Sequence, residues 1–368
     1  MAYPLLLHAK HRETSVTYES FGEWVVPWRF DSCETEYRAL RTGVGLIDYS
    51  TQALIEVKGA DRAGFLHTLL TNDITRLAPG HGCHAALLTA SAKLIANLLV
   101  LADPDALWLL YDATRAAVVT QTLERYRFSE EVALTNHERR EAVLALQGPC
   151  TLEFLSPLVG ALDTLRDSGD HMLVRSFDDV PLRIVRHTLT GDPGVLCICP
   201  AEHAHTVWTR LAQHGQREGL TLAGWEALNT ARIEAGIPWY GMDVDDSVLL
   251  PETGLETLLA SETKGCYLGQ EIIARMATYG SPNKKLVRLL VDAAEIPQAG
   301  DRIEQHGGEA GWVTSGCRSR AFGQPMALGY LKRGAYEPGM AVEILRGAQR
   351  LPATVASPAS SGKTRAGG

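Results

Sequence analysis

The residues Lys264–Glu271 have the sequence KGCYLGQE and are followed directly by IIARM. Gly265 and Gly269 permit backbone conformations that other residues resist, so the pattern predicts a tight loop around Cys266. Apolar residues at helical spacing, which are Leu268, Ile272, Ile273 and Met276, predict a helix that begins near Leu268. The stretch therefore places a thiol about one turn ahead of a helix N-terminus.

Cys266 has two interpretations. The positive end of the helix dipole and the ammonium of Lys264 favour the thiolate form of a cysteine at this place, which predicts a reactive, catalytic thiol with Lys264 beside it. Free cysteine is also among the most buried residue types, so a small residue packed in a turn is the more frequent case on composition alone. The residues themselves leave both interpretations open.

Composition narrows the class of protein. The chain has 368 residues, of which 45% are hydrophobic, and this is enough for two or three domains with their own cores. A formal net charge of -8 argues against a broad electrostatic grip on nucleic acid or on an anionic membrane. The sequence shows neither a signal-peptide pattern nor an apolar run long enough to span a bilayer. We expect a soluble cytoplasmic protein with no nucleic-acid or membrane partner.

The cysteine pattern argues against a metal centre. The seven cysteines are scattered, odd in number and contain no CxxC pair, which argues against a disulfide framework and against a structural zinc site. The segment HGCH, residues 81–84, has ligand types but lacks a fourth partner. Cys197 and Cys199 alternate along an apolar strand, where core packing is the ordinary role. We expect no bound metal.

Alternating strands and helices predict an α+β fold. Apolar residues at helical spacing predict helices over residues 63–73 and 115–126, each next to a predicted strand. Strands over residues 182–189 and 195–199 come before a further helix, HAHTVWTRLAQHG, which Gly215 is expected to cap. The two halves of this region therefore share a similar plan.

The sequence pattern changes after residue 284. Short apolar runs are separated by glycine-rich turns such as HGGEAG, a pattern typical of a small β-barrel or sandwich. The final segment, SPASSGKTRAGG, is polar and rich in glycine and serine. We predict a first α+β unit over residues 1–145, a second with the KGCYLGQE motif over 146–283, a β-barrel over 284–357 and a disordered tail over 358–368.

KGCYLGQE matches the signature segment of the YgfZ-type folate-binding proteins, which are relatives of the glycine-cleavage T protein (aminomethyltransferase) and support iron-sulfur enzymes. Other stretches resemble the same superfamily almost from end to end: YESFGEWVVPWRF, FLHTLLTNDITRLAPG, LALQGP, RIEAGIPWYGMDVDDSVLLPETGL and GGEAGWVTSG. The resemblance implies a three-lobed fold, with two α+β units around a central folate cavity and a C-terminal β-barrel. It also implies tetrahydrofolate, or a 5-substituted derivative, as cofactor.

The resemblance assigns roles residue by residue. The glutamate of the R-x-E-A-G stretch hydrogen-bonds the pterin in the family, so Glu234 is the matching candidate, with a helix-surface salt bridge as the alternative. One carboxylate can accept two N–H bonds from an amino-pyrimidinone edge. Asn72 and Tyr240 fall in stretches that line the same cavity in relatives, and Tyr267 lies in the signature motif itself. We expect these four residues, together with Asn97, to bind the cofactor.

Two departures from the T-protein pattern bear on the chemistry. T proteins carry an aspartate near the reactive folate nitrogens, and the matching stretch KLIANLLV has Ala96 and Asn97 instead. The amide of Asn97 forms hydrogen bonds but cannot act as a general base. His84 stands where T proteins have tyrosine, and Cys266 stands where they have an acidic or polar residue. The resemblance therefore implies a folate site that has lost carboxylate chemistry and gained a thiol.

Two main functions follow from the resemblance. The favoured one is a tetrahydrofolate-binding protein that supports iron-sulfur cluster assembly or repair, with Cys266 as the working thiol and iron-sulfur client or assembly proteins as partners. The alternative is a tetrahydrofolate-dependent aminomethyl- or methyltransferase (demethylase) that acts on a small or carrier-bound amine or ether. A folate-binding module without catalysis is a third reading, because fold alone does not fix function. A transferase should turn over without Cys266, whereas the maintenance role should not survive its loss.

Overall fold

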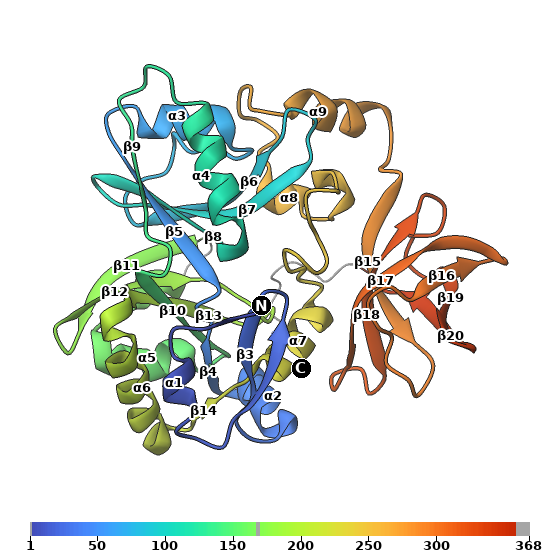
Figure 1. The fold of residues 1–368 in the computed structure, drawn as a ribbon, viewed down its shortest axis with the longest axis horizontal. Helices are drawn as coiled ribbons and strands as arrows, with labels where there is room; N and C mark the ends of the chain where they lie inside the picture. Colours follow the sequence, from blue (N-terminus) through green and yellow to red (C-terminus); the bar gives the residue numbers. More distant parts are fainter. Residues whose placement is uncertain (1, 167–169, 358–368) are drawn as a thin grey trace.

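The computed structural model describes residues 2–166 and 170–357. Two α+β regions and a C-terminal β-barrel make up the chain, which confirms the fold predicted from the sequence (Figure 1). Within the described residues, the α+β part forms an 11-stranded sheet in the order β14-β4-β10-β13-β12-β11-β6-β7-β8-β5-β9. The predicted tail, residues 358–368, lies outside the described residues.

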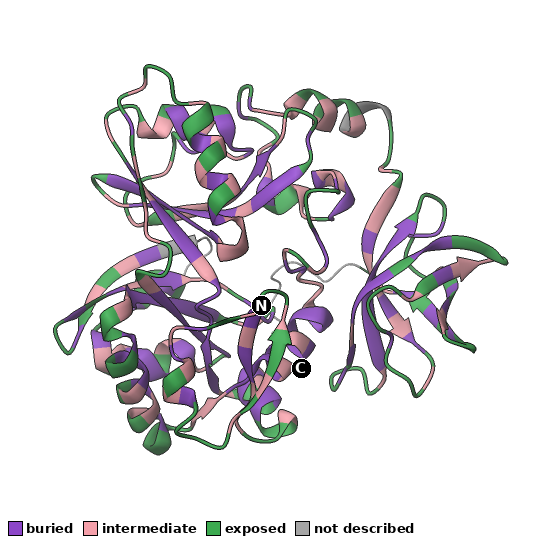
Figure 2. Cartoon of the chain, in the orientation of Figure 1, coloured by how far each residue is buried: buried purple, intermediate pink, exposed green. Residues whose placement is uncertain are grey.

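The first α+β region forms one half of this sheet, with helices packed on it. Its elements are β5 (Gln52–Lys58), α3 (Arg62–Leu69), β6 (His81–Leu88), β7 (Leu94–Ala102), β8 (Ala106–Asp112), α4 (Ala116–Arg125) and β9 (Ala133–Asn136). Leu66 of α3 and Val119 and Leu123 of α4 pack with Leu109 of β8 in one hydrophobic core. Val119 and Leu123 are one helical turn apart, so a single apolar stripe of α4 faces the sheet. The buried strands and the exposed outer faces of these helices are seen in Figure 2.

The second α+β region forms the other half of the sheet. Its elements are α2 (Cys33–Thr42), β4 (Val44–Asp48), β10 (Glu141–Gln147), α5 (Thr151–Val159), β11 (Asp170–Phe177), β12 (Val180–Arg186), β13 (Gly194–Pro200), α6 (Ala204–Glu218), β14 (Leu220–Leu222) and α7 (Trp225–Ala235). The boundary predicted after residue 145 falls inside β10, and β4, which precedes it, pairs with β10 and β14. The strand pairing therefore crosses this boundary, and the division there stays a prediction.

A small N-terminal sheet and the C-terminal barrel complete the fold. The sheet has the order β1-β3-β2 and contains β1 (Tyr3–Pro4), β2 (Thr17–Phe21) and β3 (Trp24–Arg29), with α1 (His8–His11) between β1 and β2. The closed barrel contains β15 (Lys284–Val291), β16 (Arg302–Gln305), β17 (Gly308–Arg318), β18 (Pro325–Lys332), β19 (Ala341–Arg346) and β20 (Gln349–Val355). Buried and exposed residues alternate along β20, as expected for a small barrel whose interior is filled by side chains.

A buried polar cluster attaches the barrel to α7. The guanidinium of Arg232 donates to the carboxylate of Asp243, and both side chains are fully buried. Ser315 of β17 accepts from Arg232 at 2.7 Å and donates to Asp243 at 2.5 Å, and Thr314 donates to Asp243 at 2.6 Å. Removal of one partner of a buried ion pair costs about 3–5 kcal/mol, because the other charge is left uncompensated. The cluster therefore fixes the barrel against α7 and the segment that follows it.

Three predicted helix bounds differ from the structure. The helix predicted over residues 63–73 is α3, which ends at Leu69. Gly215 does not cap α6; the helix continues to Glu218 and ends at Gly219, whose φ is 79°. Gly215 is glycine for a packing reason, because a Cβ there would lie 2.5 Å from Cβ of Leu220. The helix after the KGCYLGQE motif, α9 (Gln270–Tyr279), begins two residues later than predicted. The short helix α8 (Glu256–Leu259) precedes the motif.

Candidate functional site

A cavity of about 1320 Å³ lies between the two α+β regions. Its wall takes residues from β6, β7 and β8, from the loop between β12 and β13, from residues 236–242 and from α8. Aromatic residues in the wall include Phe21, Trp24, Tyr49, Trp225, Trp239 and Tyr240. Small-molecule sites usually measure about 300–1,000 Å³, so this cavity accommodates a drug-sized ligand with a second reactant beside it.

Two of the predicted cofactor residues lie in this wall. Asn97 is on β7, opposite Ala86 of β6, and its Oδ1 is buried with no hydrogen-bond partner in the described part of the chain. A buried acceptor without a hydrogen bond destabilises a protein by roughly 1–3 kcal/mol. A ligand that donates a hydrogen bond to this oxygen would remove that penalty. Tyr240 donates its hydroxyl to the carbonyl of Leu94 at 3.1 Å, and the guanidinium of Arg115 lies 4.9 Å from its ring centre. Burial raises the pKa of Tyr240, which keeps its hydroxyl protonated.

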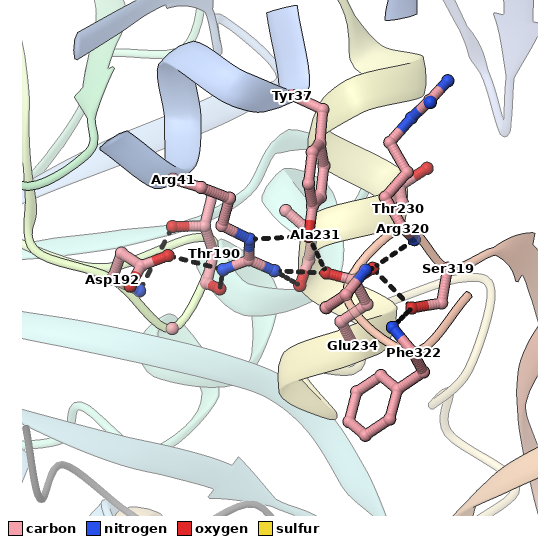
Figure 3. A network of polar contacts seen from close by, with 12 residues as sticks. Tyr37, Arg41, Thr190, Asp192, Thr230, Ala231, Glu234, Ser319, Arg320 and Phe322 are labelled. Atoms are coloured by element: carbon pink, nitrogen blue, oxygen red, sulfur yellow. Dashed lines mark hydrogen bonds and ion pairs between the residues drawn. The ribbon is translucent and has the colours of Figure 1, made fainter. Parts of the chain in front are cut away.

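Asp192 is a carboxylate in the cavity wall that the sequence analysis missed. It lies in the loop between β12 and β13, in the stretch TGDPG, whose glycines and proline indicate only a turn. Arg41 of α2 donates to Oδ2 of Asp192 at 2.5 Å and to the carbonyl of Thr190 at 2.9 Å. The same guanidinium donates to Oε2 of Glu234 at 2.6 Å, so Arg41 bridges two carboxylates (Figure 3).

Glu234 lies behind the wall rather than on it. It is 5% exposed and is not one of the residues that line the cavity. Its Oε1 accepts from Oγ of Ser319 at 2.6 Å and from the backbone N–H of Arg320 at 2.9 Å, and its Oε2 accepts from the hydroxyl of Tyr37 at 2.7 Å. Burial alone would raise the pKa of Glu234, but hydrogen bonds from Ser319, Tyr37 and Arg41 outweigh it and hold the pKa below its usual value. Direct contact of Glu234 with a pterin stays a prediction, and the geometry favours a supporting role.

Lys264 connects the KGCYLGQE motif to the first α+β region. Its side chain is buried, and its ammonium donates to the carbonyls of His67 and Leu70, each at 2.5 Å, and of Asn72 at 3.0 Å. Burial lowers the pKa of Lys264 to about 8. Among the described residues, the hydrogen bonds of this ammonium go to backbone carbonyls and not to Cys266. The geometry therefore gives Lys264 a structural role, and its catalytic role beside Cys266 stays a prediction.

Asn72 supports the wall from outside. It does not line the cavity, and its Nδ2 donates at 2.8 Å to the carbonyl of His84, which does line it. The amide of Asn72 thus holds β6 at the position of His84. Its direct contact with a cofactor stays a prediction.

The remaining residues of the motif lie outside the cavity wall. Cys266 is exposed, and Tyr267 is 9% exposed and packs in a core cluster with Leu88. Gly269 has a φ of 84°, and a Cβ there would lie 2.7 Å from the carbonyl oxygen of Thr89. The second glycine of the motif is therefore required by the backbone. The catalytic role of Cys266 and the contact of Tyr267 with a cofactor stay predictions.

Family models match both parts of the chain. The model described as the GCVT N-terminal domain matches residues 7–263. The chain belongs to the glycine-cleavage T-protein family. The model described as the glycine cleavage T-protein C-terminal barrel domain matches residues 284–360.

Individual relatives agree with this family. The chain is 29% identical to an aminomethyltransferase of Corynebacterium aurimucosum, over 95% of the chain and 96% of that protein. It is 30% identical to an aminomethyltransferase of Geobacillus thermodenitrificans, over 91% of the chain and 92% of that protein. The solved structure of the glycine cleavage system aminomethyltransferase T from Bartonella henselae has a TM-score of 0.88 and 22% identity, and the likeness covers 98% of this chain and 99% of that one. These matches confirm the superfamily and the fold, and the YgfZ-type assignment stays a prediction.

Two further properties concern the described residues alone. No helix within residues 2–166 and 170–357 is long and apolar enough to cross a membrane. In the same ranges, no group of three or more His, Cys, Asp or Glu side chains has an arrangement that could hold a metal ion.

Proposed function

We propose that this protein binds tetrahydrofolate in the cavity and transfers a one-carbon group to it from a small or carrier-bound amine or ether. The main support for the proposal is the composition of the cavity wall. Two hydrogen-bond acceptors, the unpaired Oδ1 of Asn97 and the carboxylate of Asp192, lie in a cavity that is lined by aromatic rings. The relatives named aminomethyltransferase favour this transferase function over the iron-sulfur function.

The residues of the wall fit a reduced folate. A pterin offers a row of N–H donors along its amino-pyrimidinone edge, and a carboxylate accepts such donors in charge-assisted bonds. Asp192 is the candidate for this contact, because it lines the cavity while Arg41 holds one of its oxygens in place. The aromatic residues of the wall offer apolar surface to the planar rings of the ligand.

Asn97 limits the chemistry of the transfer. Its amide accepts a hydrogen bond but does not take up a proton, so it cannot replace an aspartate as general base. We therefore propose that the chain catalyses only slowly the transfer of an aminomethyl group from the carrier that T proteins use. Its one-carbon donor is then a different compound, such as a methylated amine or ether.

The iron-sulfur function remains a second proposal because of one observation, the exposure of Cys266 in the YgfZ-type motif. An exposed thiol is available to a partner protein, whereas a buried one is not. In this proposal the chain is a YgfZ-type member, folate occupies the cavity and Cys266 works at the surface. Iron-sulfur client or assembly proteins would then be the partners.

Product analysis tests the transferase proposal. Wild-type protein is incubated with tetrahydrofolate and a panel of N-methyl, O-methyl and aminomethyl donors, and 5-methyl- and 5,10-methylene-tetrahydrofolate are quantified by mass spectrometry. The transferase proposal predicts product from at least one donor and the same rate for Cys266→Ser. No product from any donor, together with failure of Cys266→Ser to restore iron-sulfur enzyme activity in cells lacking the protein, would favour the second proposal.

A further inference from the structure

Two histidines face each other in the cavity wall. His84 lies on β6 and His187 directly follows β12; their ring centres are 5.3 Å apart, and both line the cavity. On the β6–β7 hairpin, His84 pairs with Leu99 and Ala86 pairs with Asn97. Because side chains two residues apart on a strand share a face, His84 and Asn97 lie on the same face of the hairpin. The His84 imidazole is thus on the same face of the hairpin as the Asn97 amide, and His187 lies beside His84.

The backbone carbonyl of each histidine accepts a hydrogen bond from a polar side chain. Asn72 donates to the carbonyl of His84 at 2.8 Å, and Lys264 in turn donates to the carbonyl of Asn72 at 3.0 Å. Gln147, which is fully buried, donates to the carbonyl of His187 at 3.1 Å. The KGCYLGQE motif therefore helps to position His84 through Asn72, which gives Lys264 a role in the site without contact with a ligand.

Several other titratable groups of the wall hold their protons or already have hydrogen-bond partners. Burial raises the pKa of Tyr49, Tyr111 and Tyr240, so these hydroxyls stay protonated. Asp192 is bound to the guanidinium of Arg41. Asp112, at the end of β8, accepts at Oδ1 from the hydroxyl and backbone N–H of Thr114, and burial raises the pKa of its carboxyl. Asp245 accepts at Oδ1 from the hydroxyl and backbone N–H of Ser247.

We infer that the His84–His187 pair accepts the proton that the acceptor amine loses during transfer. This inference rests on the proposed function. When a methyl group moves to N5 of tetrahydrofolate, the lone pair of N5 forms the new N–C bond, the bond between the carbon and the donor heteroatom breaks, and the electron pair stays on that heteroatom. The N5 proton passes to an imidazole, and from there to the leaving heteroatom, or to water when the donor was cationic. Imidazole suits this task because its ring nitrogens can accept a proton and release it again.

A comparison of two folates tests the pair without knowledge of the donor. Tetrahydrofolate has an N5–H that a neutral imidazole accepts, and 5-methyl-tetrahydrofolate lacks it. Titration calorimetry at pH 8 gives the ratio of the two dissociation constants for the wild type, His84→Phe, His187→Phe and the double variant. Loss of one neutral hydrogen bond should reduce the preference for tetrahydrofolate by about 2- to 12-fold in at least one single variant and in the double variant.

Two further variants separate hydrogen bonding from folding. His84→Gln keeps an acceptor oxygen and should retain more of the preference than His84→Phe, and His81→Phe, on the same strand but outside the wall, should retain the wild-type ratio. Thermal melts establish that each variant is folded. An unchanged ratio in the folded double variant would overturn the inference while the proposed function stands. Absence of binding of either folate to the wild type would overturn both.

Discussion

Replacement of Asp192 by asparagine should weaken tetrahydrofolate binding strongly while the fold is kept. Arg41 donates to Oδ2 of Asp192, and among the described residues no donor occupies Oδ1, so that oxygen is available to a ligand in the cavity. A hydrogen bond to a charged group contributes about 1.5–3 kcal/mol, which corresponds to a loss of about 10- to 150-fold in affinity at 25 °C. Asparagine has nearly the same shape, so the change removes charge rather than volume.

Titration calorimetry of four proteins measures this effect. The ratio of the dissociation constants of Asp192→Asn and the wild type gives the predicted loss of affinity. Asp105 is an exposed aspartate in the turn between β7 and β8, and Asp105→Asn is the matched control that should bind like the wild type. Glu234→Gln should cost less affinity than Asp192→Asn, because Glu234 acts through Arg41 from behind the wall. A loss below roughly threefold for Asp192→Asn, or a larger loss for Glu234→Gln, would refute the assignment.

Three other predictions concern individual side chains. Hydrogen bonds hold the pKa of Glu234 below its ordinary 4.5, so the ionised carboxylate stabilises the fold above pH 4.5, and this stabilisation is lost as the pH falls through the lower folded-state pKa. Glu234→Gln should therefore lower the melting temperature at pH 7. It should also reduce the loss of stability between pH 5 and more acidic pH, measured by thermal melts at a series of pH values. Asn97→Asp introduces a carboxylate on β7 and should raise the rate of aminomethyl transfer by about 100-fold or more, measured as 5,10-methylene-tetrahydrofolate formed. An unchanged rate would mean that another group limits the reaction. Cys266 is exposed and outside the wall, so Cys266→Ser should leave tetrahydrofolate affinity unchanged by calorimetry, and a clear loss would place the thiol at the ligand.

The sequence was most informative where a local pattern determines local structure. The helical spacing of residues 63–73 and the glycine-rich turns after residue 284 predicted α3 and the barrel, because periodicity and turn residues act over a few positions. Asn97 and Tyr240 were placed in the cavity because the stretches that contain them resemble those of the family. The cap at Gly215 failed because a close contact with Leu220, and not a helix end, requires that glycine.

The site could be predicted only in part, because burial and partners depend on residues far apart in the chain. Contact of Glu234 with a pterin stays a prediction, and the sequence did not reveal that its oxygens accept hydrogen bonds from Tyr37 of α2 and from Ser319 next to β17 of the barrel. Asp192 was missed because a turn motif does not tell which way the turn faces. Lys264 was expected beside a thiol, and its ammonium instead meets three carbonyls at the end of α3 and just after it.

The central claim is that tetrahydrofolate binds in the cavity at the face of β7. The most direct test is titration calorimetry of tetrahydrofolate with the wild type and with Asn97→Trp, whose indole fills the space in front of the strand. We predict one molecule bound per wild-type chain and no measurable binding to the folded tryptophan variant. Equal binding to both proteins, or none to the wild type, would contradict the claim.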